Sequence, residues 1–421
     1  MGWLYRLGLG LFLIALAPSV LLQMLLRGKY RRGLRERYGR PAPWGEAAAP
    51  LWLHTVSVGE AMAAAPLAQE LTRRHPALPL LVSTTTETGR AVAEQRLPAT
   101  RFVFFPLDLR FAVEGALDRL RPRLVLLTET ELWPNFLAAC ARRGIPVVVI
   151  NGRISSRSYP RYRFVRPWFR RVLGEVRLFC MQSALDAERI LDLGAPADRV
   201  AVTGNLKYDL PTLAEPPDVA AIRGSLGLGP GLRLIVAGST HRGEDEPVLA
   251  AFREAAATRP DLCLLLAPRH PERVEEAVRL AQQAGLACLR RSALPGRPAP
   301  TGGVIVLDTM GELAGLYAAA SVVFIGGSLI PHGGQNLLEA AACGRPVLHG
   351  PQMGNFAEMR DRFQAAGAAI EVADGPSLRR ALEGLLDDRE RAEAMGKAGR
   401  AIVEANRGAT LRTADLVDGL L

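Results

Sequence analysis

The chain has 421 residues, which is long for one compact core and favours two domains of similar size. Hydrophobic residues make up 49% and charged residues 22%, and the Gly and Pro residues are dispersed, which excludes a largely disordered or collagen-like chain. Its five cysteines are odd in number and form no CxxC pair. This pattern argues against a disulfide framework or a zinc site and favours a reducing compartment.

The net charge of +10 is concentrated near the N-terminus. Residues 7–26 are uncharged, and residues 27–40 then carry seven Lys or Arg against one acid. An uncharged stretch of this length spans or deeply enters a bilayer, and the basic residues after it place the rest of the chain in the cytoplasm. We therefore predict a membrane anchor over 1–27 whose basic flank binds anionic headgroups. A cleaved signal peptide and a buried N-terminal helix are the alternatives.

From residue 51 onward, short apolar runs alternate with amphipathic stretches of helix length. Before residue 210 the runs are PLWLHTVS, LPLLVSTTT, RFVFFPL, PRLVLLTE, IPVVVING, VRLFCMQS and RVAVTGN. Apolar runs separated in this way indicate buried parallel strands in βα units. We predict a first α/β domain over 28–210, followed by a linker in the Pro- and Gly-rich segment 210–231.

The same pattern resumes after the linker. The runs are LRLIVAGST, DLCLLLAP, GVIVLDT, SVVFIGG, RPVLHG and AAIEVA, which predict a second α/β domain over 211–421. The expected fold is thus α/β, with two doubly wound, Rossmann-like domains that face a cleft. Because open parallel sheets bind ligands beyond the carboxyl ends of their strands, functional residues are expected in the loops that follow the strands.

In the first domain these loops carry acids and one lysine. Glu60 follows a glycine where a strand turns into a helix, in HTVSVGE, and both a helix-start role and a catalytic base fit the local sequence. Glu129 and Glu131 in TETELWPN follow a fully apolar strand, where carboxylates are costly unless they are hydrogen-bonded or used in chemistry. Lys207 in GNLKYD is able to neutralise a phosphate, although a lone lysine usually faces solvent.

In the second domain the segment 326–350, GGSLIPHGGQNLLEAAACGRPVLHG, combines glycines with a helix start predicted over 335–343, which suits a phosphate. Asn336 and Glu339 are expected on one face of that helix, where the carboxylate can accept hydrogen bonds from ribose hydroxyls. An ordinary solvated glutamate of the helix is the alternative. The glycine spacing matches neither a dinucleotide fingerprint nor a P-loop, which disfavours oxidoreductases and P-loop NTPases.

Two other loops of the second domain complete this candidate site. Arg269 in PRHPER follows a strand, where its guanidinium can grip phosphate oxygens, and a plain surface arginine is the alternative. MGEL begins another helix, with Gly311 open to backbone approach and Glu312 in the first turn, where the helix dipole alone favours an acid.

Residues 151–171 contain seven arginines interleaved with Tyr, Phe and Trp. Such a mixture suits nucleic acid, a membrane surface or an anionic lipid headgroup, and a solvated basic helix is the plain alternative. The apolar segment upstream favours the lipid over nucleic acid.

Taken in order, HTVSVGE, TETELWPN, GNLKYD, AGSTHRGEDE, APRHPER, MGEL and GGSLIPHGGQNLLEAAACGRPVLHGP resemble the 3-deoxy-D-manno-octulosonic acid (Kdo) transferases of lipopolysaccharide synthesis. The resemblance covers nearly the whole chain. It implies a GT-B glycosyltransferase that acts at the cytoplasmic face of the inner membrane. It also implies single-displacement, inverting transfer of Kdo from CMP-Kdo to a lipid A precursor (lipid IVA), with no cofactor, no obligatory metal and no nucleic acid.

The resemblance also implies roles for individual residues. Glu60 takes the position of the proton acceptor, and Glu129 and Lys207 take positions credited with stabilising the transition state. The positions implied to contact CMP are Pro268, Arg269, Met310, Gly311, Glu312, Asn336, Leu337, Leu338 and Glu339.

Two other functions remain open from the residues alone. One is a GT-B enzyme of the same membrane that uses a UDP-sugar, which competition by CMP against UDP would distinguish. The other is a non-catalytic protein that binds anionic lipids, and the acids Glu60, Glu129 and Glu131 argue against it because carboxylates repel such a ligand.

Overall fold

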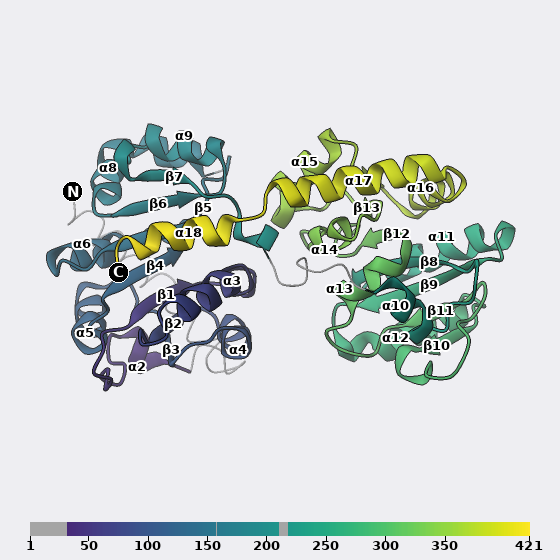
Figure 1. Ribbon diagram of the computed structural model, residues 1–421, viewed down its shortest axis with the longest axis horizontal. Coiled ribbons are helices and arrows are strands. Elements are labelled where there is room, and N and C mark those ends of the chain that lie inside the picture. Colours follow the sequence, from purple (N-terminus) through teal and green to yellow (C-terminus); the bar gives the residue numbers. More distant parts are fainter. Residues whose placement is uncertain (1–31, 157, 210–217) are drawn as a thin grey trace, which may run out of the picture. The chain divides into compact units, whose positions relative to one another are not determined.

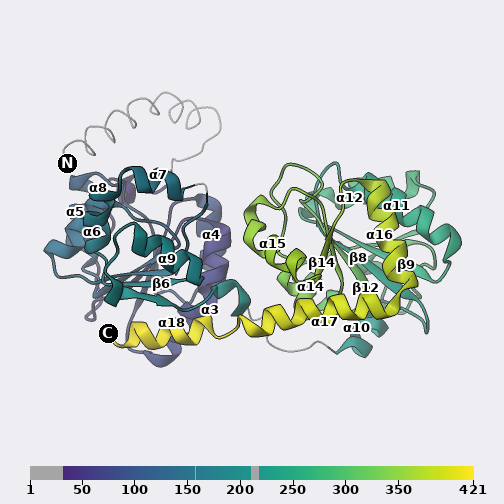
Figure 2. The same cartoon turned by 90° about the horizontal axis from the view of Figure 1, so that it is seen from above.

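The computed structural model describes residues 32–156, 158–209 and 218–421 (Figure 1). These residues form two compact units. The first contains the described residues up to Asp209 together with Asn406–Leu421, and the second contains Asp218–Ala405. Each unit is a parallel sheet with helices on both faces, which confirms the predicted pair of doubly wound α/β domains (Figures 1 and 2).

The predicted membrane anchor over 1–27 lies outside the described residues. Among the helices of residues 32–156, 158–209 and 218–421, none is both long enough and apolar enough to cross a membrane. The described chain begins near the short helix α2 (Leu34–Arg37). The carboxylate of Glu36 accepts a hydrogen bond from Phe104 N at 2.7 Å, so helix α2 is joined to the edge strand β3 of the first sheet.

The described part of the first unit contains a seven-stranded parallel sheet with the order β3-β2-β1-β4-β5-β6-β7. Its strands are β1 (Leu51–Thr55), β2 (Leu80–Thr84), β3 (Arg101–Phe104), β4 (Leu124–Thr128), β5 (Val147–Gly152), β6 (Leu178–Met181) and β7 (Val200–Val202). Each lies inside one of the predicted apolar runs. The chain winds in opposite directions from β1 and β4, so the loops after these neighbours diverge and leave room for a ligand.

Helices cover both faces of this sheet because alternate residues of a strand point to opposite sides. The helices are α3 (Val58–Arg74), α4 (Glu87–Arg96), α5 (Arg110–Leu120), α6 (Pro134–Arg142), α7 (Tyr159–Phe164), α8 (Arg166–Gly174) and α9 (Ala184–Asp192). In β1, Leu51 and Leu53 pack in one core with α3 and α4. Trp52, between them, packs in the opposite core with α5, α6, α8 and α9.

The C-terminal segment corrects the predicted boundary of the second domain. We predicted that 211–421 forms one domain, but Asn406–Leu421 pack with the first unit. Helix α18 (Ala409–Asp418) buries Ala409, Ala414 and Val417 in the core that also contains residues of α3. The apolar face of α18 therefore completes the first unit, although its sequence follows the second.

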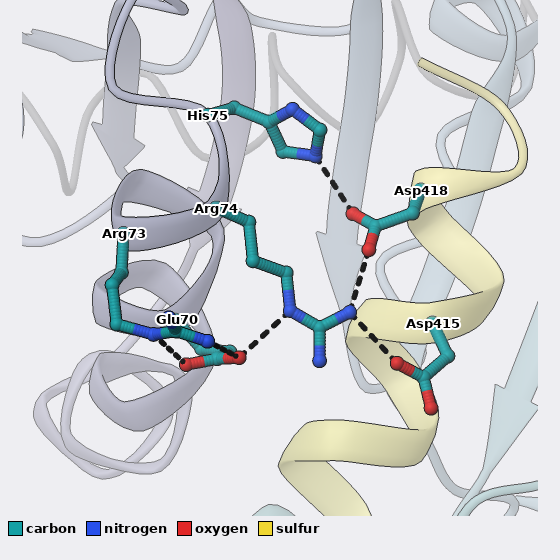
Figure 3. A network of polar contacts seen from close by, with 6 residues as sticks. All are labelled: Glu70, Arg73, Arg74, His75, Asp415 and Asp418. Carbon is teal, nitrogen blue, oxygen red and sulfur yellow. Dashed lines mark hydrogen bonds and ion pairs between the residues drawn. The ribbon is translucent and has the colours of Figure 1, made fainter.

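Ion pairs on the polar side of α18 reinforce this packing (Figure 3). Arg74 Nη1, at the end of α3, lies 2.7 Å from Asp415 and 2.5 Å from Asp418. His75 Nε2 lies 2.8 Å from the other carboxylate oxygen of Asp418, and Arg74 Nε also contacts Glu70 at 2.7 Å. Arg74 and Asp415 are 341 residues apart in the chain, which explains why a local pattern does not reveal the pairing.

The second unit contains, in its described residues, a parallel sheet with the order β10-β11-β9-β8-β12-β13-β14. Its strands are β8 (Arg233–Thr240), β9 (Leu262–Pro268), β10 (Cys288–Arg290), β11 (Val304–Val306), β12 (Ala320–Ile325), β13 (Val347–His349) and β14 (Ala369–Glu371). All but β10 were predicted. This edge strand has only three, partly exposed residues and therefore no apolar run that would reveal it.

The helices of the second unit vary widely in length. They are α10 (Val219–Ser225), α11 (Asp245–Thr258), α12 (Val274–Gln283), α13 (Leu313–Leu316), α14 (Leu338–Ala342), α15 (Ala357–Ala365), α16 (Gly375–Asp387) and α17 (Arg389–Ala405). The sheet changes its winding direction between β8 and β12. The segments at or after the ends of β9, β11 and β12 carry the predicted CMP contacts. They therefore leave the sheet at the same edge as the loop after β8.

The ion pairs of α18 yield a first prediction. Replacing Asp418 by Asn removes the charge that faces Arg74 and His75, and because these side chains are partly exposed we expect α18 to loosen by about 1 kcal/mol. Hydrogen exchange should show amides of α18 exchanging about fivefold faster. Asp415→Asn is the control, since Asp415 is 65% exposed and makes a single one of these contacts, and it should have a smaller effect. Equal acceleration in α17 would contradict local opening of α18.

Candidate active site

Glu60 lies in the first turn of α3, just beyond the carboxyl end of β1. Ser57 is the N-cap of this helix, and its Oγ accepts a hydrogen bond from Glu60 N. Glu60 Oε2 accepts hydrogen bonds from Val56 N at 2.8 Å and from Thr128 Oγ1 at 2.5 Å, while Oε1 accepts one from Ser57 Oγ at 3.1 Å. The structure thus confirms the helix-start role and also joins this helix to the end of β4.

These contacts are compatible with a base. Three donors fix the orientation of the Glu60 carboxylate, as preorganised catalytic groups require. Oε2 accepts two of the hydrogen bonds, whereas Oε1 accepts one from a hydroxyl that is able to rotate. Oε1 therefore retains a lone pair with which to take a proton from a substrate.

The fold brings Glu129 and Lys207 close together, as we expect of two residues that share a site. Lys207 Nζ lies 4.0 Å from Glu129 Oε1. Glu129 follows β4 with φ of 53°, a left-handed conformation that costs a non-glycine residue on the order of 1–3 kcal/mol and is found mostly at functional sites. Burial raises the pKa of Glu129, the charge of Lys207 opposes that rise, and the charge of Glu60 adds to it.

Glu131 belongs to the same group of acids. Its Oε2 accepts a hydrogen bond from Trp133 Nε1 at 2.9 Å. Burial, followed by the negative charge of Glu60, raises the pKa of Glu131 to about 7. We call Glu60, Glu129 and Glu131 the acid cluster. At neutral pH it carries less than its full negative charge, because Glu131 is partly protonated.

A short helix and the C-terminal segment together hold Lys207. This residue lies in the 3₁₀ turn Leu206–Asp209, whose first side chain is completely buried in the core beside α3. At the end of the turn, Asp209 accepts hydrogen bonds from Gly408 N at 2.7 Å and Thr410 N at 2.6 Å, at the start of α18. The segment that returns from the second unit therefore fixes the turn that presents Lys207 to Glu129.

In the second unit, the fully buried Glu244 organises the loop after β12. Its carboxylate accepts hydrogen bonds from Gly327 N at 2.6 Å and from Ser328 N, Leu329 N and His241 N at 2.9 Å each. Four N–H groups compensate for removing the charge from water. A protein carboxylate thus shapes the loop that we had associated with phosphate binding.

Three histidines meet at the carboxyl edge of this sheet. The ring of His241 lies 3.8 Å from that of His332 and 5.4 Å from that of His270, and Gln335 Nε2 lies 3.0 Å from His241 Nε2. Burial, and then electrostatic repulsion from His332, His270 and Arg269, lowers the pKa of His241 to about 4. His241 is therefore neutral at pH 7. The side chains of His270, His332 and Arg269 are exposed and can donate hydrogen bonds.

The predicted CMP contacts differ in how accessible they are. Pro268 ends β9 and Arg269, which follows it, is exposed. Met310 is 76% exposed, and Gly311 has a φ of 85° with open space where a Cβ would stand. Glu312 Oε2 already accepts hydrogen bonds from Arg291, Nη2 at 3.0 Å and Nε at 3.1 Å. A ligand at Glu312 must share this carboxylate with Arg291.

The predicted helix over 335–343 is shorter in the structure. Helix α14 covers Leu338–Ala342, and Asn336 precedes it, its Oδ1 accepting a hydrogen bond from Leu338 N at 3.1 Å. Asn336 therefore does not share a helical face with Glu339, as we had expected. Leu337 and Leu338 are completely buried, so only their backbone can reach a ligand. A helix of five residues also has a weaker dipole than a long helix would.

The glycines of this loop serve contacts within the chain. A Cβ at Gly333 would stand 2.4 Å from Asn355 Nδ2, and one at Gly334 would stand 2.3 Å from Met353 Sδ. Both glycines also have positive φ. The fold therefore requires them by itself, so their presence is no independent sign of a phosphate.

Several residues of both sites were not identified from the sequence. Thr128, Asp209 and Glu244 lie inside motifs that we singled out, but only the structure shows that they hold Glu60, the Lys207 turn and the glycine loop. Thr128 gave a usable signal, because it is the polar residue that ends an apolar strand. Among the described residues, no cluster of three or more His, Cys, Asp or Glu is arranged to hold a metal ion.

Two family models match the chain. Residues 32–210 match the model described as 3-Deoxy-D-manno-octulosonic-acid transferase (kdotransferase). Residues 302–402 match the model of group 1 glycosyl transferases. The two matches fall on different units, so both units have relatives among glycosyltransferases.

Relatives with known names match along almost the whole chain. A 3-deoxy-D-manno-octulosonic acid transferase of Bordetella pertussis is 38% identical over 98% of this chain and 100% of its own. One of Haemophilus influenzae is 36% identical over 92% of this chain and 91% of its own. Among solved structures, a UDP-N-acetylglucosamine 2-epimerase of Listeria monocytogenes, described as putative, is 18% identical with a TM-score of 0.57, over 87% of this chain and 95% of that one. That likeness concerns the fold alone.

The acid cluster yields a prediction about pH. Folding raises the pKa of Glu131 from its usual 4.5 to about 7, so the folded protein holds a proton that the unfolded chain has lost. Ionisation of Glu131 therefore opposes folding, and stability falls as pH rises through this range. Glu131→Gln should be more stable than the parent at about pH 8.5, by on the order of 2 kcal/mol, and the difference should shrink toward about pH 5.

Urea unfolding at several pH values measures this difference. Glu175→Gln is the control, because Glu175 is exposed and its replacement should change stability equally at every pH. A stabilisation by Glu131→Gln that did not vary with pH would show that packing, not charge, is responsible.

Proposed function

The chain belongs to the 3-deoxy-D-manno-octulosonic-acid (Kdo) transferase family, and from this membership we propose how it acts as a Kdo transferase of lipopolysaccharide synthesis. The donor is CMP-Kdo and the acceptor is a lipid A precursor such as lipid IVA. The second unit binds the donor, and the first supplies the base. The observation that carries this proposal is the orientation of Glu60 by Thr128, Val56 and Ser57 within the acid cluster.

In the proposed reaction, Glu60 Oε1 takes the proton of an acceptor hydroxyl as that oxygen attacks the anomeric carbon of Kdo. The new carbon–oxygen bond forms while the bond from that carbon to the phosphate of CMP breaks, and CMP leaves with the bonding electrons. A single displacement of this kind inverts the anomeric configuration. One base on the acceptor side is enough for it.

Glu129 and Lys207 are proposed to stabilise the transition state as a pair. Lys207 Nζ lies 4.0 Å from Glu129 Oε1, so the carboxylate helps to orient the lysine. Glu129 follows β4 in a left-handed backbone conformation, as residues at functional sites often do. Lys207 then offers positive charge to the oxygens that gain negative charge during transfer.

Arg269 is proposed to hold the phosphate of the donor. It is exposed at the end of β9, and its backbone is fixed by the hydrogen bond from Arg269 N to Thr240 O at 2.9 Å. His270 and His332 add donors on the same edge. Cytidine contacts are assigned to Met310, Gly311 and Glu312, and to Asn336 through Glu339, with Leu337 and Leu338 contributing only through their backbone.

We also propose that transfer needs no metal and no other cofactor, because Arg269 and Lys207 supply positive charge for the phosphate and the histidines add hydrogen-bond donors. Turnover should then be unchanged by EDTA. The proposed location is the cytoplasmic face of the inner membrane. The uncharged residues 7–26 and the basic residues 27–40 support it, since they suit an anchor followed by a headgroup-binding segment.

Replacing Glu60 by Gln tests the base. The amide keeps the shape but cannot accept the proton, so we expect kcat to fall about 10²–10⁴-fold with the dissociation constant of CMP-Kdo unchanged. Mass spectrometry of the lipid product measures the turnover. Glu87→Gln is the matched control, because Glu87 also lies in the first turn of a helix of this unit, and it should leave kcat near normal. Near-normal turnover of Glu60→Gln would remove Glu60 from this role.

Replacing Arg269 by Met tests the donor site. Loss of a charge-assisted contact to phosphate should weaken CMP-Kdo binding about tenfold or more, as measured by calorimetry. Arg279→Met, which removes an exposed arginine from α12, should have no such effect.

Nucleotide competition tests the identity of the donor. CMP should compete with the donor and UDP should not. Preferential competition by UDP would instead identify a UDP-sugar transferase.

A further inference from the structure

The connection from β5 to β6 forms a basic face on the first unit. Residues 153–174 contain seven arginines and no Asp or Glu. Within them, Arg161 and Arg163 of α7 and Arg166, Arg170 and Arg171 of α8 are all exposed. Figure 2 shows α7 and α8 along one side of the unit. We call α7, α8 and the adjoining surface of α9 the basic face.

Helix α7 is held rigidly, yet one of its aromatic side chains is left outside. The ring of Tyr162 stacks on Phe169 of α8, with centroids 4.7 Å apart and planes 10° apart. Tyr159 donates a hydrogen bond from its hydroxyl to Asp192 Oδ2 of α9 at 2.7 Å. Phe164, at the end of the same helix, is 90% exposed. Two rings therefore fix the helix, and the third is presented to the surroundings at a cost in exposed apolar area.

A cavity of about 700 Å³ lies between α8 and α9. Arg166 and Arg170 line it from α8, while Leu191 and the segment 194–197 line it from α9 and the following turn. The stem of Arg170 lies across Gly194, where a Cβ would stand 2.8 Å from its Cγ. The cavity is thus lined by two arginine side chains and by apolar groups, including Leu191, which is 37% exposed.

The acids around this face only partly neutralise it. Asp192 lies 3.9 Å from Arg163 and 3.7 Å from Arg166, so it faces two arginines at once. Glu188, on the solvent side of α9, and Glu175, beyond the end of α8, are the other acids on these helices, since Asp186 is buried and accepts a hydrogen bond from Ile154 N. Five exposed arginines outnumber them.

We propose that the basic face docks on a bilayer that contains anionic lipids, with a lipid phosphate held by Arg166 and Arg170 in the cavity and Phe164 inserted among the acyl chains. Arginine binds phosphate oxygens through two parallel N–H groups, and the apolar wall of the cavity suits the part of a lipid next to its headgroup. An aromatic residue beside several arginines is the composition that inserts at a membrane interface.

A lipid fits this face better than nucleic acid does. Single-stranded nucleic acid needs several open aromatic faces for stacking. Here Tyr162 is covered by Phe169, and Tyr159 lies under the guanidinium of Arg189 at 5.6 Å. Among the described aromatic residues of α7 and α8, Phe164 is 90% exposed and the others are at least partly buried, which suits insertion of Phe164 into an apolar layer.

The position of the face agrees with the proposed function, on which this inference rests. Burial raises the pKa of Tyr162, and the charge of Glu131 raises it further, so α7 lies beside the acid cluster. The segment that carries α7 also begins at Arg153, whose charge lowers the pKa of Glu129. Docking through α7 and α8 would bring lipid acceptors to the unit that holds Glu60.

The test uses the full chain on vesicles and does not depend on turnover. Phe164→Cys is labelled with an environment-sensitive fluorophore, and quenching by brominated acyl chains reports insertion. Leu411→Cys is the matched control, because Leu411 is 53% exposed on α18 of the same unit but lies outside the basic face. The unsubstituted protein, labelled in parallel, corrects for its own cysteines. We expect quenching at position 164 and not at 411, and only with vesicles that contain phosphatidylglycerol.

Substitutions in the cavity test the phosphate contact. Adding Arg166→Ser and Arg170→Ser to the labelled protein should weaken this quenching about fivefold for each arginine. Arg96→Ser with Arg119→Ser removes the same charge from exposed positions on α4 and α5, and it should have little effect. Equal loss in both pairs would show that only net charge matters and would overturn the cavity as a specific site.

Further arms separate the sources of phosphate and the kinds of partner. Inorganic phosphate in excess should not change the quenching. Loss of quenching when phosphate is added would overturn a lipid-specific site. If single-stranded nucleic acid, added in place of vesicles, changed the fluorescence of the label at position 164, the surface would not be a bilayer-docking surface. Quenching at 164 together with an inactive enzyme would reject the proposed transfer but retain the face, whereas normal transfer without quenching would reject the face alone.

Discussion

The hydrogen bond from Thr128 Oγ1 to Glu60 Oε2 joins the end of β4 to the helix that follows β1. The chain continues in different directions after these two strands. Thr128 is the last residue of β4, and Glu60 lies in the first turn of the helix after β1. Because β1 and β4 are neighbours in the sheet, their carboxyl ends meet, and residues 68 positions apart share one hydrogen bond. Glu129 and Glu131 follow Thr128 directly, so the same contact sets where the whole acid cluster stands.

All three carboxylates of the acid cluster are partly buried, but each has different polar partners. Three donors hold Glu60, a lysine partly balances Glu129, and an indole N–H contacts Glu131. The raised pKa of Glu131 follows from having less compensation than its burial requires. The second unit shows the opposite case in Glu244, whose four N–H partners make a fully buried carboxylate part of the loop structure.

Helix α18 connects the residues of the proposed active site to the rest of the first unit. Asp209 ties the turn of Lys207 to the start of α18, while Arg74 and His75 tie the end of α3 to the last turn of α18. Helix α3 begins at the acid cluster and the 3₁₀ turn carries Lys207, so α18 supports both partners of the proposed chemistry without contributing a side chain to it. The connection from β5 to β6 has a similar double use, because it borders the acid cluster and forms the basic face.

The two sheets, most of their strands and the catalytic candidates follow from local sequence patterns. Apolar runs locate buried strands because such strands have no polar alternation, and the polar residue after each run lies at the functional edge by the geometry of parallel sheets. This logic identified Glu60, Glu129, Lys207 and Arg269 at strand ends. It missed β10, which has no such run, and it extended α14 by several residues because the capping role of Asn336 leaves no clear local signal.

Which groups contact each other, in contrast, depends on the tertiary structure. The packing of Asn406–Leu421 on the first unit, the pairing of Glu312 with Arg291, the burial of Leu337 and Leu338, and the four N–H groups around Glu244 join residues that are distant in sequence or differ only in orientation. Local sequence carries propensity and period, whereas burial and electrostatic partners depend on what the fold places opposite each side chain. The chemistry of an acid such as Glu131 is therefore set by its neighbours.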